Sequence, residues 1–322
     1  MKKALKVIGK VLLGILVVIV LFLAATTVYH RVMLKKEAPL REPVGQLVEV
    51  DGNNMCIYTE GSGEHTIVFM SGFGTPSPVM DFRSLYKLLS GDYRIVVIEK
   101  FGYGFSDIVD GERSFDTILR QDREALDKAG IKRPFILCPH SMSGVEALRW
   151  AQLYPDEVEA IVGLDMALPN EYKDIDLQST ESLENIAYIM NGMGLNRLAD
   201  EKALPALDTG TLTREENDIY KAVFFSMYMN KTMRNECDPE DTINFCDAIE
   251  NDPQPDIPIL LFVSDGTGGT GHDKEVWRGY VREYAARLPD AEIIELDCGH
   301  YVHNIEQDKI AADMREFIED LD

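Results

Sequence analysis

The sequence predicts an α/β protein built on a mostly parallel sheet with helices on both of its faces. Short, continuously apolar segments such as Thr66–Met70 and Phe135–Cys138 are typical of strands that are buried on both faces. Helical segments of about 10–15 residues separate these strands, and this alternation favours parallel pairing through crossovers. The pattern stops at about Leu168 and resumes at Ile257, so we expect the sheet to carry one large insertion.

The start of the chain is set apart from this domain by its hydropathy. Val11 to Val28 is a run of eighteen uncharged, mostly apolar residues with basic residues on both sides. At ~1.5 Å per residue the run spans about 27 Å, close to the hydrocarbon thickness of a bilayer. We therefore predict a membrane anchor and connector over residues 1–41, with a transmembrane helix at about 8–29. A cleavable signal peptide is the alternative, since Ala24–Ala25 is compatible with a cleavage site.

The net charge of −23 is divided unevenly along the chain. Residues 1–41 hold eight Lys/Arg and one Glu, so the domain at residues 42–322 has a net charge of −30. An acidic body of this kind is repelled by nucleic acid, which is not expected as a partner. Nearly equal numbers of basic residues flank the apolar run, so charge does not decide the orientation of the span. A large domain after a single N-terminal span is most simply placed outside the cell. The sequence therefore predicts a single-pass protein of the cell membrane with an extracytoplasmic domain.

The five cysteines predict no disulfide framework, because five is an odd number. Cys56, Cys138 and Cys298 lie in or beside expected strands and are typical of small buried hydrophobic residues. Cys237 and Cys246 are close together in a polar helical stretch, and they are candidates for pairing in an oxidising compartment.

The elements of the domain follow a regular order after the connector. Two short strands flank a turn at Asp51–Asn54, and the alternation of strand and helix begins after them. Strands are expected at 47–50, 55–58, 66–70, 94–99, 135–138, 158–165, 257–265 and 291–296, and helices near 81–89, 115–129, 144–150, 274–288 and 305–321.

The insertion at about residues 169–255 is helical in pattern and rich in Met and aromatic residues. Its clearest helices are Glu184–Met193 and Arg214–Asn230. Because it separates the sixth and seventh core strands, we expect it to lie over the strand ends as a lid. Its apolar residues either line a substrate cavity or form a small core of their own.

A serine stands at the apex of a sharp turn that joins the strand at Phe135 to the helix at Gly144. Residues 135–144 read Phe-Ile-Leu-Cys-Pro-His-Ser-Met-Ser-Gly, which raises the Ser141 hydroxyl above the carboxyl edge of the sheet. The turn needs small residues, and Ser143 and Gly144 meet that need. The stretch resembles the nucleophile elbow of the α/β-hydrolase family, with Pro139 in place of the usual Gly. The resemblance covers about residues 45–168 and 256–320. It is to esterase- and lipase-like serine hydrolases with a helical lid, of a bacterial, membrane-anchored type.

A serine nucleophile needs a base within hydrogen-bond reach, and the base needs a carboxylate that orients it. Of the six histidines, only His300 follows the last expected core strand, in a Gly-His turn at the carboxyl edge of the sheet. His140 adjoins Ser141 in sequence and is expected to point away from its hydroxyl. His300 is therefore the predicted base.

Two aspartates are candidates for the acid, and both satisfy the family's chain order of Ser, Asp and His. Asp165 ends the strand after the elbow strand, and Gly163–Pro169 resembles the stretch that carries the acid in pancreatic-type lipases. Many relatives take the acid after the next strand instead. Asp265 stands there, two residues earlier than in the usual Gly-x-x-Asp pattern. We favour Asp165 and keep Asp265 as the alternative.

The resemblance also implies two backbone N–H donors for an oxyanion. The matching positions are Phe73, in the loop after the strand at 66–70, and Met142, which follows the nucleophile. Phe101–Ser106 resembles the family's Gly-x-Gly-x-Ser loop, which also faces the site.

Two further patterns resemble cofactor sites, one for a dinucleotide and one for a metal, but neither predicts a cofactor. Gly266–Gly271 matches G-x-G-x-x-G, but only some fifty residues with one strand follow it, too few for a dinucleotide-binding domain, so we expect a mobile loop at the rim of the site. His303 and Cys298 lie near His300 in sequence, but no matching ligand cluster appears elsewhere. Neither a metal nor an organic cofactor is expected.

The sequence thus predicts a serine hydrolase that cleaves an ester, or less readily an amide, through an acyl-enzyme on Ser141. A small-molecule or lipid-like acyl substrate is expected, because the chain combines an anchor at residues 11–28 with an apolar insertion. Aminopeptidase-like and acyltransferase activities of the same fold are alternatives, as is a non-catalytic ligand-binding module.

Overall fold

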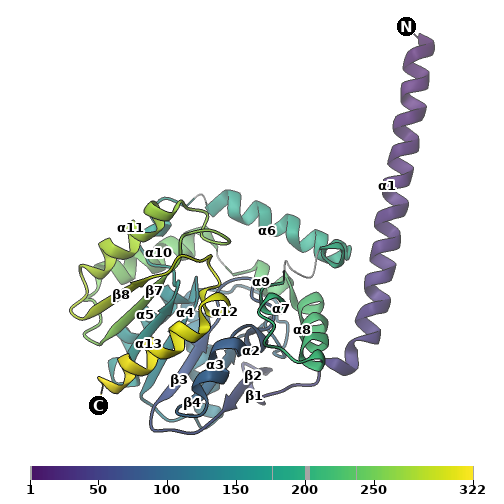
Figure 1. Ribbon diagram of the computed structural model, residues 1–322. Helices are drawn as coiled ribbons and strands as arrows, with labels where there is room; N and C mark the ends of the chain where they lie inside the picture. The colour runs from purple at the N-terminus through teal and green to yellow at the C-terminus, as the bar shows by residue number, and fades with distance from the viewer. Residues whose placement is uncertain (1, 176, 200–203, 237, 322) are drawn as a thin grey trace.

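The computed structural model describes residues 2–175, 177–199, 204–236 and 238–321, and it contains an eight-stranded sheet between two layers of helices (Figure 1). This confirms the predicted fold class. The strands are β1 (Gln46–Val50), β2 (Asn53–Glu60), β3 (Thr66–Met70), β4 (Arg94–Glu99), β5 (Phe135–Pro139), β6 (Val158–Leu164), β7 (Ile259–Val263) and β8 (Ala291–Glu295).

The sheet has the strand order β1-β2-β4-β3-β5-β6-β7-β8. β2 is antiparallel to both of its neighbours, and all pairs from β4 to β8 are parallel. From β3 the chain passes first to β4 on one side and then to β5 on the other. The carboxyl ends of β3 and β5 therefore form a switch point, where open α/β sheets bind ligands.

Helices cover both faces of the sheet and enclose two separate cores. Alternate residues of one strand enter different cores: Val96 and Ile98 point to one, and Ile95 and Val97 point to the other. The first core is closed by α4 (Phe115–Lys128), α5 (Ser143–Leu153), α10 (Pro239–Asn251) and α11 (Lys274–Ala285). The second is closed by α2 (Pro78–Asp81), α3 (Arg83–Leu89), α12 (Val302–Ile305) and α13 (Gln307–Glu319).

Between β6 and β7 the described residues form helices and no strand. These helices are η3 (Glu171–Lys173), α6 (Leu177–Gly192), η4 (Leu195–Leu198), α7 (Pro205–Asp208), α8 (Arg214–Met227), α9 (Lys231–Arg234) and α10. We call residues 169–255 the helical insertion. It divides in two: α7 and α8 share a small core with Met80, whereas α10 joins the main core, where Phe245 stacks on Phe115 at 4.8 Å between ring centroids.

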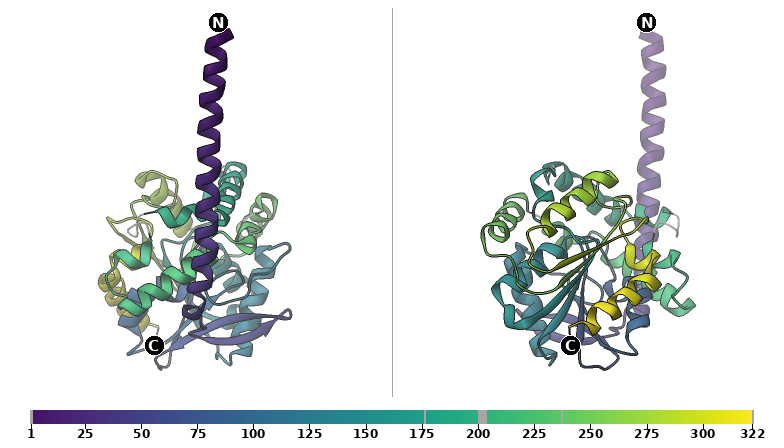
Figure 2. Two further views of the ribbon diagram at one scale, coloured as in Figure 1. Left: turned by 90° about the vertical axis from the view of Figure 1, so that its right-hand side faces the viewer. Right: turned by 60° about the vertical axis from the view of Figure 1, so that its left-hand side comes forward.

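The first helix, α1 (Lys2–Lys36), projects far beyond the domain (Figures 1 and 2). Residues 3–22 are exposed, and burial begins near residue 23. An 18-residue window of this helix has a mean hydropathy of 3.0, so it is long and apolar enough to cross a membrane. The helix exceeds the predicted 8–29 because the basic residues that flank the apolar run are themselves good helix formers.

Four cysteines are buried free thiols, namely Cys56, Cys138, Cys246 and Cys298. The predicted pairing of Cys237 with Cys246 involves a residue outside those that the structure describes. Burial raises the pKa of the Cys138 thiol well above its usual range, in keeping with a small core residue.

Candidate active site

Ser141 lies at the apex of the turn between β5 and α5. Its φ of 55° is in the left-handed region, which residues with a side chain adopt rarely and mostly at functional sites. The neighbouring Ser143 fits inside the turn, where its Oγ donates to the carbonyl of Met70 at 2.7 Å. Because Met70 ends β3, this bond ties the turn to the adjacent strand.

The loop after β3 lies against this turn. A Cβ atom on Gly72 would be 2.6 Å from the Cβ of Ser141, so only glycine allows the approach. Phe73 follows in the same loop, and Met142 stands at the N-terminus of α5, where the helix dipole favours negative charge. Phe73, Met142, Ser141 and His300 all line one cavity of about 580 Å³, which we call the serine cavity.

His300 is paired with Asp165. The Nδ1 atom of His300 lies 2.6 Å from Oδ2 of Asp165, and both side chains are buried. The other oxygen of Asp165 accepts two hydrogen bonds at 2.7 Å, from the N–H of Ser264 and from Nε1 of Trp277. Three donors therefore hold this carboxylate in place, and His300 presents the remainder of its ring to the serine cavity.

Asp265 is bonded elsewhere. Its Oδ1 accepts from the N–H of Thr267 at 2.9 Å and from the hydroxyl of the same residue at 2.6 Å. These two bonds lower the pKa of Asp265. The carboxylate thus closes a turn in its own loop, while the structure places Asp165 at His300.

A second histidine–aspartate pair lies close by. Nε2 of His303 is 2.9 Å from Oδ2 of Asp81, and both side chains are buried. His140 stands between the pairs, with its ring centroid 4.6 Å from that of His300 and 4.8 Å from that of His303. Its Nε2 lies 3.2 Å from the carbonyl oxygen of His300. Burial lowers the pKa of His140 well below its usual range, and its two histidine neighbours add to that effect.

The glycine-rich loop at residues 266–271 packs against the base. A Cβ atom on Gly269 would lie 2.3 Å from Cδ2 of His300, and the N–H of His300 donates to the carbonyl of Thr267 at 2.8 Å. The loop therefore forms one wall of the site. No group of three or more His, Cys, Asp or Glu among the described residues could hold a metal ion.

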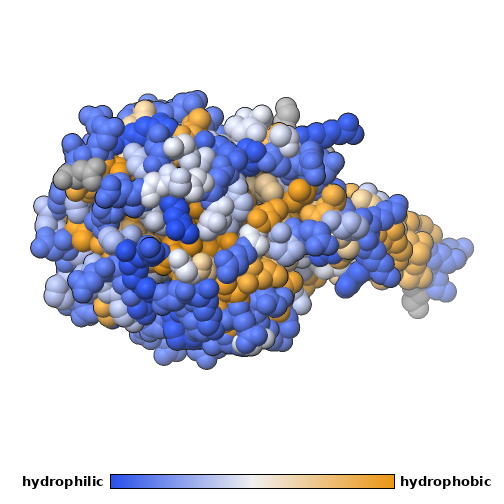
Figure 3. Space-filling view, turned by 90° about the horizontal axis from the view of Figure 1, so that it is seen from below, coloured by the Kyte–Doolittle hydropathy of each residue, from blue (hydrophilic) through white to orange (hydrophobic). Residues whose placement is uncertain are grey.

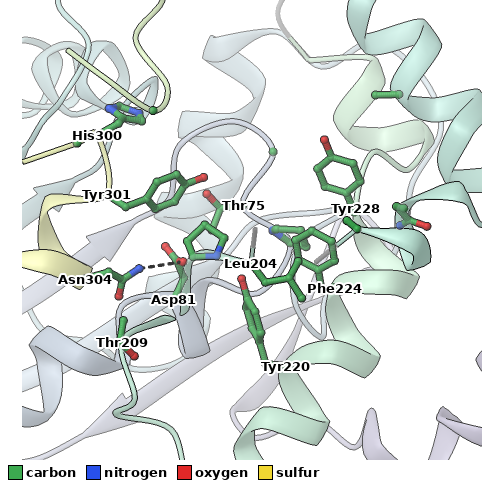
Figure 4. A pocket seen from close by; sticks show the side chains of 18 of the residues that line it. Thr75, Asp81, Leu204, Thr209, Tyr220, Phe224, Tyr228, His300, Tyr301 and Asn304 are labelled. Atoms are coloured by element: carbon green, nitrogen blue, oxygen red, sulfur yellow. Dashed lines mark hydrogen bonds between the residues drawn. The ribbon is translucent and has the colours of Figure 1, made fainter. Parts of the chain in front are cut away.

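His300 also borders a second, larger cavity of about 810 Å³, which we call the insertion cavity (Figure 4). Aromatic side chains of the insertion, Tyr220, Phe224 and Tyr228, line one side of it. Tyr301 and the Asp81–Asn304 pair line the other side. The two cavities thus meet at the histidine, under the helices of the insertion.

Three residues of the site were not found from the sequence. Trp277 has the pattern of a core residue on an amphipathic helix, and only the fold brings its Nε1 to Asp165. Asp81 is one more acidic residue near a helix end. Glu171 lines the serine cavity, and burial raises the pKa of its carboxyl well above the usual range, with the charge of Asp165 adding to this. Nothing in the neighbouring sequence marks Glu171, because the raised pKa of its carboxyl results from burial in the folded domain.

The sequence model described as the alpha/beta hydrolase family matches residues 67–313. An uncharacterized protein of Bacillus subtilis, YbdG, is 33% identical over 323 residues, which cover 99% of each chain. A cis-3-alkyl-4-alkyloxetan-2-one decarboxylase of Shewanella oneidensis is 23% identical, covering 83% of this chain and 86% of that one.

Solved structures show the same fold at lower identity. The crystal structure of an epoxide hydrolase from Bacillus megaterium in complex with an inhibitor has a TM-score of 0.64 and 17% identity, covering 85% of this chain and all of that one. The reactions in these names differ, so the comparisons establish a shared fold and family.

Proposed function

The chain belongs to the alpha/beta hydrolase family, and we propose that it is a serine hydrolase that cleaves an ester, or less readily an amide, through an acyl-enzyme on Ser141. The observation that carries the proposal is the contact between His300 and Asp165 beside a cavity that also contains Ser141. A strained serine, a histidine and a buried carboxylate are the parts that acyl transfer requires.

The proposed chemistry assigns one role to each group. His300 takes the proton of the Ser141 hydroxyl while its oxygen attacks the substrate carbonyl, and Asp165 fixes the tautomer and stabilises the imidazolium. The N–H groups of Phe73 and Met142 stabilise the oxyanion. His300 then protonates the departing alcohol, leaving an ester on Ser141. Water, deprotonated by His300, hydrolyses that ester and releases the carboxylic acid.

An elongated, apolar acyl substrate fits this site best. The insertion cavity is larger than the serine cavity, is lined by aromatic residues, and shares His300 with it. An acyl chain in one cavity and the leaving group in the other would place the scissile carbonyl at the histidine. We further propose that α1 is an uncleaved anchor, since it becomes partly buried from about residue 23 and its Thr26 and His30 lie against Gly194 of the insertion. We place the domain outside the cytoplasm, the simplest arrangement for a large domain after a single N-terminal span.

Fluorophosphonate labelling of the full chain in detergent tests the proposal. We expect a single labelled peptide that contains Ser141 and no labelling of Ser141→Ala. Hydrolysis of short and long p-nitrophenyl esters then measures turnover. A folded chain that neither labels nor turns over these esters would instead be a ligand-binding protein of this fold.

A peptidase that binds a substrate amine is the second candidate. Glu171, Asp174 and Glu184 line the serine cavity, and no Lys or Arg lies among its described lining residues. An ammonium group bound there would favour the ionised form of the Glu171 carboxyl against the effect of burial, which raises its pKa. If an amine binds there, Glu171→Gln raises KM for aminoacyl substrates and leaves KM for p-nitrophenyl esters unchanged. An equal effect on both substrate types would exclude this candidate.

A further inference from the structure

Helix α6 has its apolar face turned to solvent. Leu183, Ile186 and Ile189 are 66%, 53% and 53% exposed, whereas Glu184 and Asn191 on the opposite face are buried. Surface helices of soluble domains show the reverse arrangement. The inward residues are held in place, since Nδ2 of Asn191 donates to the carbonyl of Tyr228 and Glu184 lines the serine cavity. The helix therefore cannot hide its apolar face by rotating.

Contacts with α1 place α6 at a defined height along the anchor. A Cβ atom on Gly194, two residues after α6 ends, would lie 2.4 Å from the Cβ of His30 and 3.0 Å from the carbonyl oxygen of Thr26. Arg197 fixes this contact, because its Nε lies 2.9 Å from Nδ1 of His30 and its guanidinium pairs with Glu37 at 2.6 and 2.8 Å.

This height coincides with one end of the apolar run. The run ends at Val28, and Arg31 follows, so the hydrocarbon boundary nearest the domain falls where α1 meets Gly194. In Figure 1, α6 runs across the top of the domain, on the side toward which α1 projects. Hydrophilic residues dominate the opposite face of the domain, with hydrophobic patches between them (Figure 3).

From these observations we infer that the outer face of α6 docks on the surface of the bilayer that α1 crosses. Ile186 and Ile189 enter the interface between head groups and acyl chains, as the apolar face of an interfacial helix does. Leu183 and Met190 stand at the edges of this face, where they are exposed and also border the cavities. The exposed basic residues Arg31, Lys35 and Lys36 lie at the same end of the anchor and attract anionic head groups.

The docking of α6 on the bilayer also indicates a substrate class. This inference rests on the proposed hydrolase activity. Leu183 and Glu184 line the serine cavity, and Ala187, Met190 and Asn191 line the insertion cavity, so α6 roofs both. A roof that touches lipid delivers molecules from the bilayer. The substrate is therefore an ester amphiphile that resides in the membrane and moves sideways beneath α6.

Quenching by brominated lipid tests the docking without using catalysis. Full-length Ser141→Ala carrying Ile186→Trp is reconstituted in vesicles of phosphatidylcholine and phosphatidylglycerol with brominated acyl chains. Leu153→Trp is the matched control, because Leu153 is also an exposed apolar residue but ends α5 just before β6 begins. It therefore lies at the amino edge of the sheet, opposite the edge that carries the elbow and α6. The native Trp150 and Trp277 are buried and provide the background.

We expect bromine to quench the Ile186→Trp fluorescence and to leave the Leu153→Trp fluorescence unchanged. Flotation with the vesicles confirms first that the chain is inserted. Equal quenching at both positions, or none at either, overturns the docking. Lack of quenching at Ile186 together with cross-linking between copies through α6 shows that a second chain covers this face instead.

Activity on a soluble ester and on an ester lipid in vesicles distinguishes the docking of α6 from the catalytic reaction. Ile186 and Ile189 line neither cavity, so Ile186→Asp/Ile189→Asp should hydrolyse a soluble short-chain ester at the normal rate. Its activity on an ester lipid in vesicles should fall roughly tenfold to a hundredfold, as expected from the loss of two buried apolar side chains. Leu153→Asp should retain both activities.

An equal loss on both substrates would point to a damaged fold and overturn the delivery role of α6. Loss of neither would overturn it too. Quenching at Ile186 in a chain that never reacts with a fluorophosphonate would keep the docking and reject the hydrolase.

Discussion

The structure contains two buried histidine–aspartate pairs whose histidines are only three residues apart. In each, a ring nitrogen lies within 3 Å of a carboxylate oxygen, at 2.6 Å for His300–Asp165 and at 2.9 Å for His303–Asp81. Only His300 faces the cavity that contains Ser141. A buried histidine–aspartate pair is therefore not evidence of catalysis by itself. Its function depends on what the other ring nitrogen of the histidine faces.

The surroundings of the two rings differ accordingly. His303 packs against Phe82 and His140 at 4.8 Å between ring centroids, lines neither cavity and is fully buried. Its pair joins α2 to α12, which supports the floor of the insertion cavity through Asp81. His300 lies instead in the loop after β8, paired with the residue that follows β6 and bordering the same cavity as Ser141 of the elbow. The first pair is proposed for proton transfer and the second for stability.

The largest contrast is expected when the proposed nucleophile or base is removed. Ser141→Ala and His300→Ala should each lower kcat for a p-nitrophenyl ester by roughly 10⁴–10⁶-fold, because the groups act as a unit. Both variants should keep the melting temperature within a few degrees. A His300→Ala enzyme with near-normal kcat would show that another group serves as the base.

The next largest difference is expected between substitutions of the two candidate acids, Asp165 and Asp265. Asp165→Asn removes the carboxylate that sets the tautomer of His300, and kcat should fall by roughly 10⁴-fold. Asp265→Asn changes only a turn in the loop at 265–267, so kcat should stay within about threefold. The reverse order of effects would assign the acid to Asp265 and require the loop to rearrange in the active enzyme.

Disruption of the second pair should affect folding more than chemistry. His303→Leu leaves a buried oxygen of Asp81 without its closest donor, which should lower the free energy of unfolding by about 1–3 kcal/mol. Urea unfolding of the detergent-solubilised chain measures this loss. The kcat of the folded fraction should change by less than about tenfold. A loss of kcat as large as that of His300→Ala would erase the distinction between the pairs.

The histidine between the pairs should produce the smallest effect, seen in the pH dependence of stability. Because the pKa of His140 is lowered in the folded state, the unfolded chain binds this proton first as the pH falls. The contribution is present above about pH 6.5 and is lost below it, by at most about 1.4 kcal/mol per pH unit. His140→Gln should remove this part of the slope. Identical slopes for both chains between pH 5 and 6.5 would contradict the lowered pKa.

The sequence alone determined the features that depend on neighbouring residues. The apolar runs and the helices between them specified the sheet, because a strand buried on both faces needs a continuous apolar sequence. Ser141 was marked by its small neighbours, and His300 by its place after the last core strand. The length and hydropathy of Val11–Val28 marked a helix able to cross a membrane.

The tertiary structure decided which side chains meet across the chain. Asp165 and Asp265 both end strands at the same edge, and neither spacing nor residue type shows which carboxylate reaches His300. That choice depends on the three donors around Asp165, which come from three places far from it in sequence: Ser264 after β7, Trp277 in α11 and His300 after β8. The outward face of α6 was decided in the same way. Periodicity shows that a helix has an apolar face, but only its contacts show whether that face points to the core or to the surface, because direction depends on neighbours that the local sequence does not contain.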